Sequence, residues 1–174
     1  LSDAVDGGRT SPEIVASLSG LAGEGIKTQS RMNGRVMNNF PDVRASACDL
    51  LGKVATEESK NTLVSIAVED KEPMVVTAAI RSLGNIGIND NDEVVAMIEF
   101  VHRKYAVLNP TSSLALEVLN AYEKLEGSVQ DKNAMVASIV AIRSNTRYAK
   151  SVRDRAQQLL NTIQQNGQRK SESQ

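Results

Sequence analysis

The chain contains one histidine and one cysteine, and these two residues limit the nucleophilic chemistry that it could perform. A Ser-His or Cys-His pair could use only His102, which lies in the segment EFVHRKY near the expected end of a helix. The helix dipole would favour its charged form there, so we expect a solvated side chain beside the apolar residues Val101 and Tyr105. Cys48 lies in an Ala- and Leu-rich segment, where a free cysteine packs as a small apolar group.

Acidic residues gather at positions where helices are expected to begin, namely Glu57-Glu58 and the run from Asp90 to Glu93. Carboxylates at such positions complement the helix dipole and satisfy free backbone amides, so we interpret them as capping groups. One thiol allows neither an internal disulfide nor a cysteine-based metal site. The segment Gly84 to Gly87 lacks the preceding strand and the following lysine of a phosphate loop. The sequence therefore predicts no catalytic residue, no metal ligand and no cofactor.

The composition indicates helices and gives no general attraction to nucleic acid. Hydrophobic residues make up 41% of the 174 residues and aromatic residues 3%, and no apolar run approaches the roughly 20 residues of a membrane-spanning helix. Ala, Leu, Val and Ile dominate the apolar set, which suits close-packed helices. The net charge of -1 disfavours binding to a phosphate backbone.

A repeat in the sequence predicts where helices begin, and these helices would position any functional side chain. The segments PEIVASLSGLAG, PDVRASACDLLG and PMVVTAAIRSLG each run from a proline (Pro12, Pro41, Pro73) to a glycine eleven positions later. A proline is tolerated at the first position of a helix, so each one predicts a helix start, and Pro110 and Lys150 begin two weaker copies. The glycine either ends its helix in a left-handed conformation or lets a neighbouring helix approach, and the sequence leaves both readings open.

Further helices are expected between these copies, and they would alternate with them as partners. Their apolar residues recur at helical spacing in three segments, Leu63 to Ala67, Val94 to Tyr105 and Met135 to Ile142. A first partner helix is expected over Ile26 to Phe40, although Asn33-Gly34 is a turn signal inside it. Residues 1–10 and 166–174 are polar without apolar periodicity, and we expect disordered ends there.

The stretch PDVRASACDLLGKVATEESKNTLVSIAVEDKEPMVVTAAIRSLGNIG resembles HEAT repeats of the bacterial, phycobilisome-lyase-like type. Departures are Val15 and Val76, which stand where the repeat has an arginine. The resemblance implies an all-α fold: an α-solenoid of stacked antiparallel helical hairpins, with about nine helices in a single domain over residues 11–165. It also implies curved surfaces that bind other proteins.

Two sets of side chains are candidates for partner binding. Leu114, Val118 and Tyr122 recur at four-residue steps on the side of their helix that is polar in the Pro41 copy, and Met74 extends this stripe; altered packing in an irregular repeat is the alternative explanation. A basic run could recognise an acidic partner, or could be a solvated face with helix-end charges. This run comprises Arg143, Arg147, Lys150, Arg153 and Arg155.

The sequence therefore predicts a non-catalytic scaffold that binds a protein partner. The alternative is a lyase-like or nucleic-acid-processing HEAT enzyme, or an auxiliary of such an enzyme. The helix from Pro12 corresponds to the second helix of a hairpin, so we expect an uncapped N-terminal end that docks on upstream chain or on another subunit. A cytoplasmic location is favoured over a periplasmic or exported one, which would require that an upstream signal had been removed.

Overall fold

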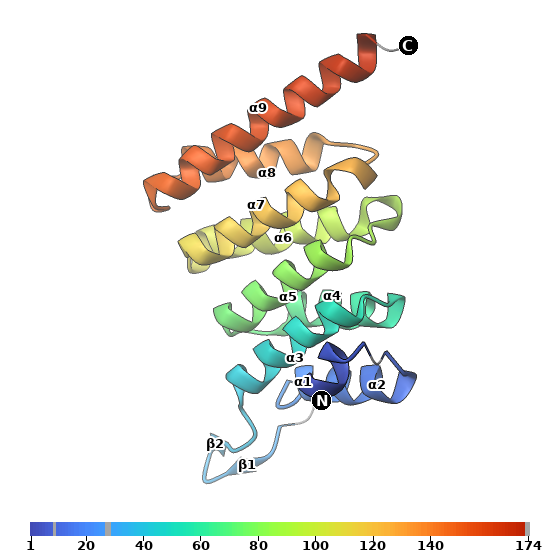
Figure 1. Ribbon diagram of the computed structural model, residues 1–174. Helices are drawn as coiled ribbons and strands as arrows, with labels where there is room; N and C mark the ends of the chain where they lie inside the picture. The colour runs from blue at the N-terminus through green and yellow to red at the C-terminus, as the bar shows by residue number, and fades with distance from the viewer. Residues whose placement is uncertain (9, 27–28, 173–174) are drawn as a thin grey trace. The chain divides into compact units, whose positions relative to one another are not determined.

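The computed structural model describes residues 1–8, 10–26 and 29–172, and within them nine α-helices and one short β-hairpin follow one another along the chain (Figure 1). The chain divides into two compact units, Leu1–Ile88 and Asn89–Gln174. None of the described helices is long and apolar enough to cross a bilayer.

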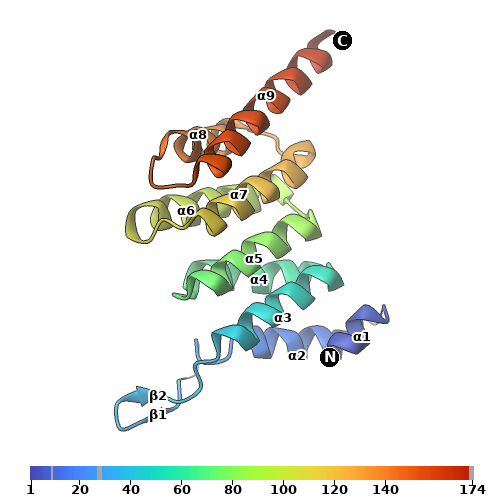
Figure 2. The ribbon, with the colours of Figure 1, turned by 60° about the vertical axis from the view of Figure 1, so that its left-hand side comes forward.

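In the first unit, two helix pairs are stacked on each other. Helix α2 packs against α3 and α4 packs against α5, and the pairs meet through α3 with α5 and through α2 with α4 (Figure 2). The elements of this unit are α1 (Ser2–Asp6), α2 (Pro12–Ala22), β1 (Arg31–Met32), β2 (Arg35–Val36), α3 (Pro41–Val54), α4 (Glu57–Glu69) and α5 (Pro73–Ile86).

The second unit repeats this plan. Helix α6 packs against α7 and α8 against α9, and the pairs meet through α6 with α8 and through α7 with α9. Its elements are η1 (Asp90–Asp92), α6 (Glu93–Leu108), α7 (Ser112–Leu125), η2 (Glu126–Ser128), α8 (Asn133–Ser144) and α9 (Lys150–Glu172). The prediction of an all-α fold whose helices pack in sequential pairs, as in HEAT-like α-solenoids, is confirmed.

The prolines place most of the expected helix starts correctly. Pro12, Pro41 and Pro73 are the first residues of α2, α3 and α5, where the missing amide costs no hydrogen bond. Pro110 is different, because α7 begins at Ser112, two residues later than the repeat frame requires.

Gly52 shows which reading of the repeat glycine applies in α3. It lies inside this buried helix, and a Cβ at this position would lie 2.7 Å from both the Cβ and the Oγ of Ser82 on α5. The glycine therefore permits the close contact of α3 with α5. The left-handed helix ends belong to other residues, Ala55 after α3 (φ 55°) and Gly87 after α5 (φ 75°).

The expected first partner helix over Ile26 to Phe40 was wrong. Asn33 and Gly34 both have positive φ, 50° and 78°, and they form the turn of a hairpin in which Arg31 pairs with Val36 and Met32 with Arg35. Residues 27 and 28 lie outside the described part of the chain, and because residue 26 and residues 29–40 form no helix, α2 itself is the first member of the first pair.

This arrangement also corrects the expected phase at the N-terminal end. The first unit begins with the complete pair of α2 and α3, so α2 is not a second helix that lacks its partner. Helix α1 packs on α3 as well, and the Nζ of Lys53 lies 2.7 Å from the Oδ1 of Asp6.

The structure also differs from the sequence prediction near both termini. Helix α1 lies within residues 1–10, and α9 continues through residues 166–172, where no regular structure was expected. Residues 9, 173 and 174 lie outside the described part of the chain. Residues 11–165, expected to form a single domain, are shared between the two compact units.

The contact at Gly52 generates a first prediction. Gly52→Ala should lower the free energy of unfolding by about 1 to 3 kcal/mol, because the added methyl group meets Ser82 in a packed core. Urea denaturation of the full chain measures this change. Gly20→Ala in α2 is the matched control, because its Cβ would meet no atom within 4 Å and alanine suits a helix better than glycine. Equal stability of the two variants would contradict the account.

Candidate functional site

A long connection between α2 and α3 carries three of the four large apolar side chains of the first unit that are at least half exposed. It comprises residues 23–40, whereas residues 70–72 suffice to connect α4 with α5. Connections longer than about 12 to 15 residues are uncommon in compact domains and are usually functional or disordered. Residues 29–40 are here called the hairpin arm, and Figures 1 and 2 show its strands extending away from the helices of their unit.

The hairpin arm presents three large apolar side chains to solvent. Met32 is 62% exposed, Met37 is 50% exposed and Phe40 is 50% exposed. Isolated exposed apolar residues are ordinary, but three within the twelve residues of the hairpin arm form a group that a partner could cover. These three residues were not among the predicted binding residues, although the turn signal Asn33-Gly34 indicates a hairpin.

Backbone and side-chain hydrogen bonds give the hairpin arm a defined conformation. The amide of Met37 donates to the carbonyl of Ser30 at 2.8 Å, and the amide of Ser30 donates to the Oδ1 of Asn38 at 2.9 Å. The Nδ2 of Asn38 donates to the Oε1 of Glu24 at 2.6 Å. At Gly25 (φ 75°) a Cβ would lie 2.1 Å from the carbonyl oxygen of Asn38, so only glycine permits this crossing of the chain.

A buried ion pair fixes the base of the hairpin arm to the helices. The Nε of Arg44 on α3 lies 2.7 Å from the Oδ2 of Asp70, and both side chains are almost completely buried. The same guanidinium donates to the Oδ1 of Asn39 at 2.9 Å and to the carbonyl of Glu24 at 3.3 Å. A cavity of about 240 Å³ adjoins this pair, and residues from the start and the second strand of the arm line it, among them Gln29 and Val36.

An open groove of about 730 Å³ lies between α2 and α4, on the helices of the same unit. Glu24, Glu57 and Glu58 line it, and a hydrogen bond of 3.0 Å joins Ser19 and Thr62 across it. Glu57 forms an ion pair with Lys60. The charged residues that line the groove are therefore all acidic, in contrast to the charged residues of the hairpin arm.

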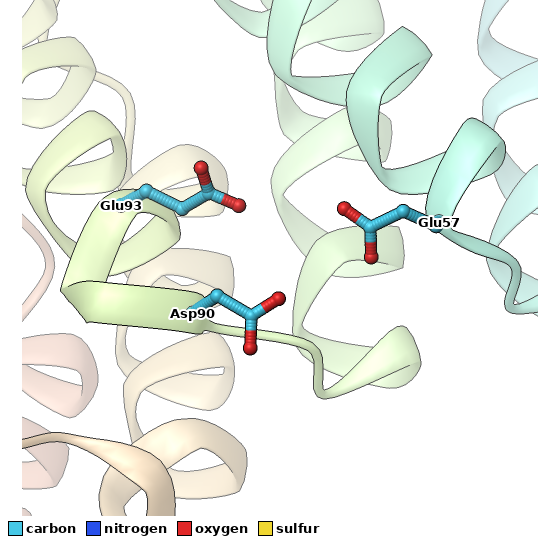
Figure 3. Close-up of side chains that lie close together, drawn as sticks. All are labelled: Glu57, Asp90 and Glu93. Atoms are coloured by element: carbon cyan, nitrogen blue, oxygen red, sulfur yellow. The ribbon is translucent and has the colours of Figure 1, made fainter.

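The acidic residues that we interpreted as capping groups do lie in first helical turns. Figure 3 shows Asp90, the first residue of η1, Glu93, the first residue of α6, and Glu57, the first residue of α4. The side chains that accept from backbone amides at these starts are neutral, however: Thr56 accepts from Ser59, and Asn89 accepts from Val95. The carboxylates therefore contribute through the helix dipole.

Asp92 plays a separate role in the second unit. Its carboxylate accepts hydrogen bonds from the amides of Asp131 and Gln130, which lower its pKa and connect the start of α6 to the segment before α8.

The predicted apolar stripe on α7 is not a surface. Leu114, Val118 and Tyr122 are all buried, so the prediction of a solvent-facing docking site for them was wrong. The late start of α7 explains two of the three: counted from the helix start and not from the proline, Val118 corresponds to Ala47 and Tyr122 to Leu51, which are buried in α3. Leu114 corresponds to the exposed Val43, so the shift does not account for its burial. Met74, which was expected to extend the stripe, is 47% exposed on α5.

Most side chains of the predicted basic run are engaged within the second unit. Arg155 pairs with Glu123 and Lys150 with Asp154. Arg147 donates to the carbonyl of Ala106 at 2.7 Å, and Arg143 to the Oε1 of Gln157 at 3.0 Å. The Nε of Arg153 is buried and has no hydrogen-bond partner among the described residues. Arg155 and Lys150 are therefore paired with carboxylates, whereas Arg143 and Arg147 remain exposed cations with neutral partners.

His102 lies in the core of the second unit, contrary to the expected solvated position. It is 3% exposed; its Nδ1 lies 2.9 Å from the Oγ of Ser138, and its Nε2 lies 3.2 Å from the hydroxyl of Tyr148. Burial lowers its pKa to about 4, so the imidazole is neutral near pH 7 and the expected dipole-stabilised cation does not form. Both ring nitrogens are occupied by hydroxyl groups, and Ser138 is itself 4% exposed. We interpret the Ser-His contact as core packing.

Cys48 packs as expected. It is fully buried in α3, and burial together with the neighbouring charge of Asp49 raises the pKa of its thiol to about 12.

Burial of His102 predicts a pH dependence of stability. The pKa is about 4 when folded and 6.5 when unfolded, so stability is complete above pH 6.5 and falls by about 3 kcal/mol as the pH drops from 6.5 to 4. Urea denaturation at several pH values measures the slope, and His102→Gln should reduce it in this range. His102 is the only histidine, so its imidazole NMR signals report the folded pKa directly. A folded midpoint near 6.5 would refute the prediction.

Comparison with known proteins identifies the central part of the chain. No curated protein and no solved structure matches it. Residues 35–108 match the family model described as HEAT repeats, a segment that begins in β2 and ends with α6. This agrees with the sequential helix pairs and with the Pro41 and Pro73 copies of the repeat. Residues 35–108 are therefore a HEAT-repeat segment.

Proposed function

We propose that this chain is a non-catalytic scaffold that binds a protein partner, and that the hairpin arm is its principal contact. HEAT repeats generally serve as protein-interaction scaffolds, because stacked helix pairs offer extended surfaces while each pair contacts only its neighbours. The observation that carries the proposal is the exposure of Met32, Met37 and Phe40 on a connection that the repeat itself does not require.

The arm combines a fixed base with adaptable side chains. Arg44 ties Asn39 and the carbonyl of Glu24 to the helices, so little backbone entropy has to be lost at the base when a partner binds. Methionine is flexible and polarisable, and it adapts to irregular apolar surfaces. Phe40, which directly precedes α3, adds a large aromatic side chain of the kind that dominates binding energies.

Two ion pairs within the basic run and the low net charge of the chain support a protein partner over nucleic acid. Arg155 and Lys150 pair with carboxylates of their own unit, and the net charge of the chain is -1. Nucleic-acid binding without strong sequence preference depends on uncompensated cations that replace phosphate counterions.

The apolar side chains of the arm provide the test. A binding partner is first identified by cross-linking of the full chain in its native extract, and its affinity is then measured with both proteins purified. The triple variant Met32→Ser, Met37→Ser, Phe40→Ser should weaken binding at least tenfold, because each substitution removes apolar area that the partner covers. Its helical circular dichroism should equal that of the parent, since all three side chains are exposed.

Val107 and Leu108 provide the matched control, because they are 70% and 71% exposed at the end of α6. The double variant Val107→Ser, Leu108→Ser should bind with parental affinity. If the triple variant also binds with parental affinity, the arm is not the contact and the proposal fails.

A further inference from the structure

The hairpin arm and the residues just before it carry a positive net charge, whereas the net charge of the whole chain is negative. From Gly25 to Phe40 the sequence contains Lys27, Arg31 and Arg35 and no acidic residue, although the net charge of the chain is -1. The arm is therefore a locally basic segment that also exposes Met32 and Met37.

Two carboxylates near the base of the arm have partners of their own. Glu24 accepts a hydrogen bond from Asn38, and Asp70 is paired with Arg44. The guanidinium of Arg31 donates to the neutral Oε1 of Gln29 at 2.8 Å and forms no ion pair with the described residues. Its positive charge is therefore not offset by a carboxylate of the described chain.

We infer that the partner segment covered by the arm is an acidic polypeptide with apolar side chains between its carboxylates. This inference rests on the proposed function and adds the chemistry of the partner to it. Apolar groups at the centre of a contact supply most of its binding energy, whereas charges around them increase the association rate and exclude partners of the wrong sign. Met32 and Met37 would take the first role, and the positive charge of the arm, to which the described Arg31 contributes, would take the second.

Other occupants predict different behaviour. A second copy of the chain could offer the acidic groove between α2 and α4, which Glu24 and Glu58 line. Anionic lipid could also attract the basic arm. The acidic polypeptide is favoured because the exposed methionines suit an irregular protein surface, and because the groove already contains Glu57 paired with Lys60.

The experiment uses two fluorescein-labelled peptides with the full chain. One peptide alternates Glu or Asp with Leu or Phe, and the other replaces every Glu and Asp by Gln and Asn. Fluorescence anisotropy should show at least tenfold tighter binding of the acidic peptide at low salt, and this preference should shrink at 0.3 M salt because the exposed charges are screened. The double variant Arg31→Glu, Arg35→Glu should abolish the preference.

Arg103→Glu with Arg143→Glu is the matched control, since it changes the net charge equally on exposed residues of the second unit. This control should keep the preference for the acidic peptide. Equal affinity for the two peptides, or a preference that survives reversal of Arg31 and Arg35, overturns the inference.

The triple serine variant of the arm separates the two proposals. If it weakens binding to the isolated partner while Arg31→Glu, Arg35→Glu does not, the scaffold function stands and the acidic partner is rejected; if neither variant matters, both fail. Tighter binding to phosphatidylserine vesicles than to the acidic peptide would overturn the inference in favour of membrane. A dimer in sedimentation experiments that is lost on reversal of Arg31 and Arg35 would overturn it in favour of a second copy.

Discussion

The buried contact between Arg44 and Asp70 is the interaction on which the first unit depends. Arg44 belongs to α3, and Asp70 lies between α4 and α5, where its Oδ1 also accepts from the amide of Glu72 at 2.9 Å. The remaining donors of the guanidinium reach Asn39 and the carbonyl of Glu24. One charged group therefore joins two helix pairs to the base of the hairpin arm, and the loss of either charge would leave the other buried without a partner.

In the second unit, the position equivalent to Arg44 carries no charge. When α3 and α7 are aligned from their first residues, Ala115 takes the place of Arg44. The polar groups of its core are neutral: His102 contacts Ser138 and the hydroxyl of Tyr148. A neutral network costs less to bury than a charge, but its histidine makes this unit sensitive to acid.

The sequence was informative wherever one local signal determined one structural feature. Proline at the first helical position placed the starts of α2, α3 and α5, and Cys48 packed as a small apolar group. The candidate surface on α7 failed at Val118 and Tyr122 because the repeat frame was carried through Pro110, and a shift of two residues turns a helix far enough to exchange its buried and exposed faces. The burial of His102 could not be predicted, because its hydroxyl partners come from α8 and from a residue just before α9.

The hairpin arm illustrates a conflict between two signals in the sequence. The apolar spacing of Met32, Val36 and Phe40 favours a helix, whereas Asn33-Gly34 favours a tight turn. The turn prevails because Asn33 and Gly34 readily adopt the positive φ values that a tight hairpin turn requires.

The burial of Cys48 makes the chain convenient for spectroscopy. Its thiol is inaccessible and, with a pKa near 12, almost entirely protonated, so alkylating reagents and mild oxidants should leave it unmodified in the folded protein. A cysteine introduced at an exposed position would then be the sole reactive thiol. Fluorescent or spin labels could be attached there without first removing the natural cysteine from the core.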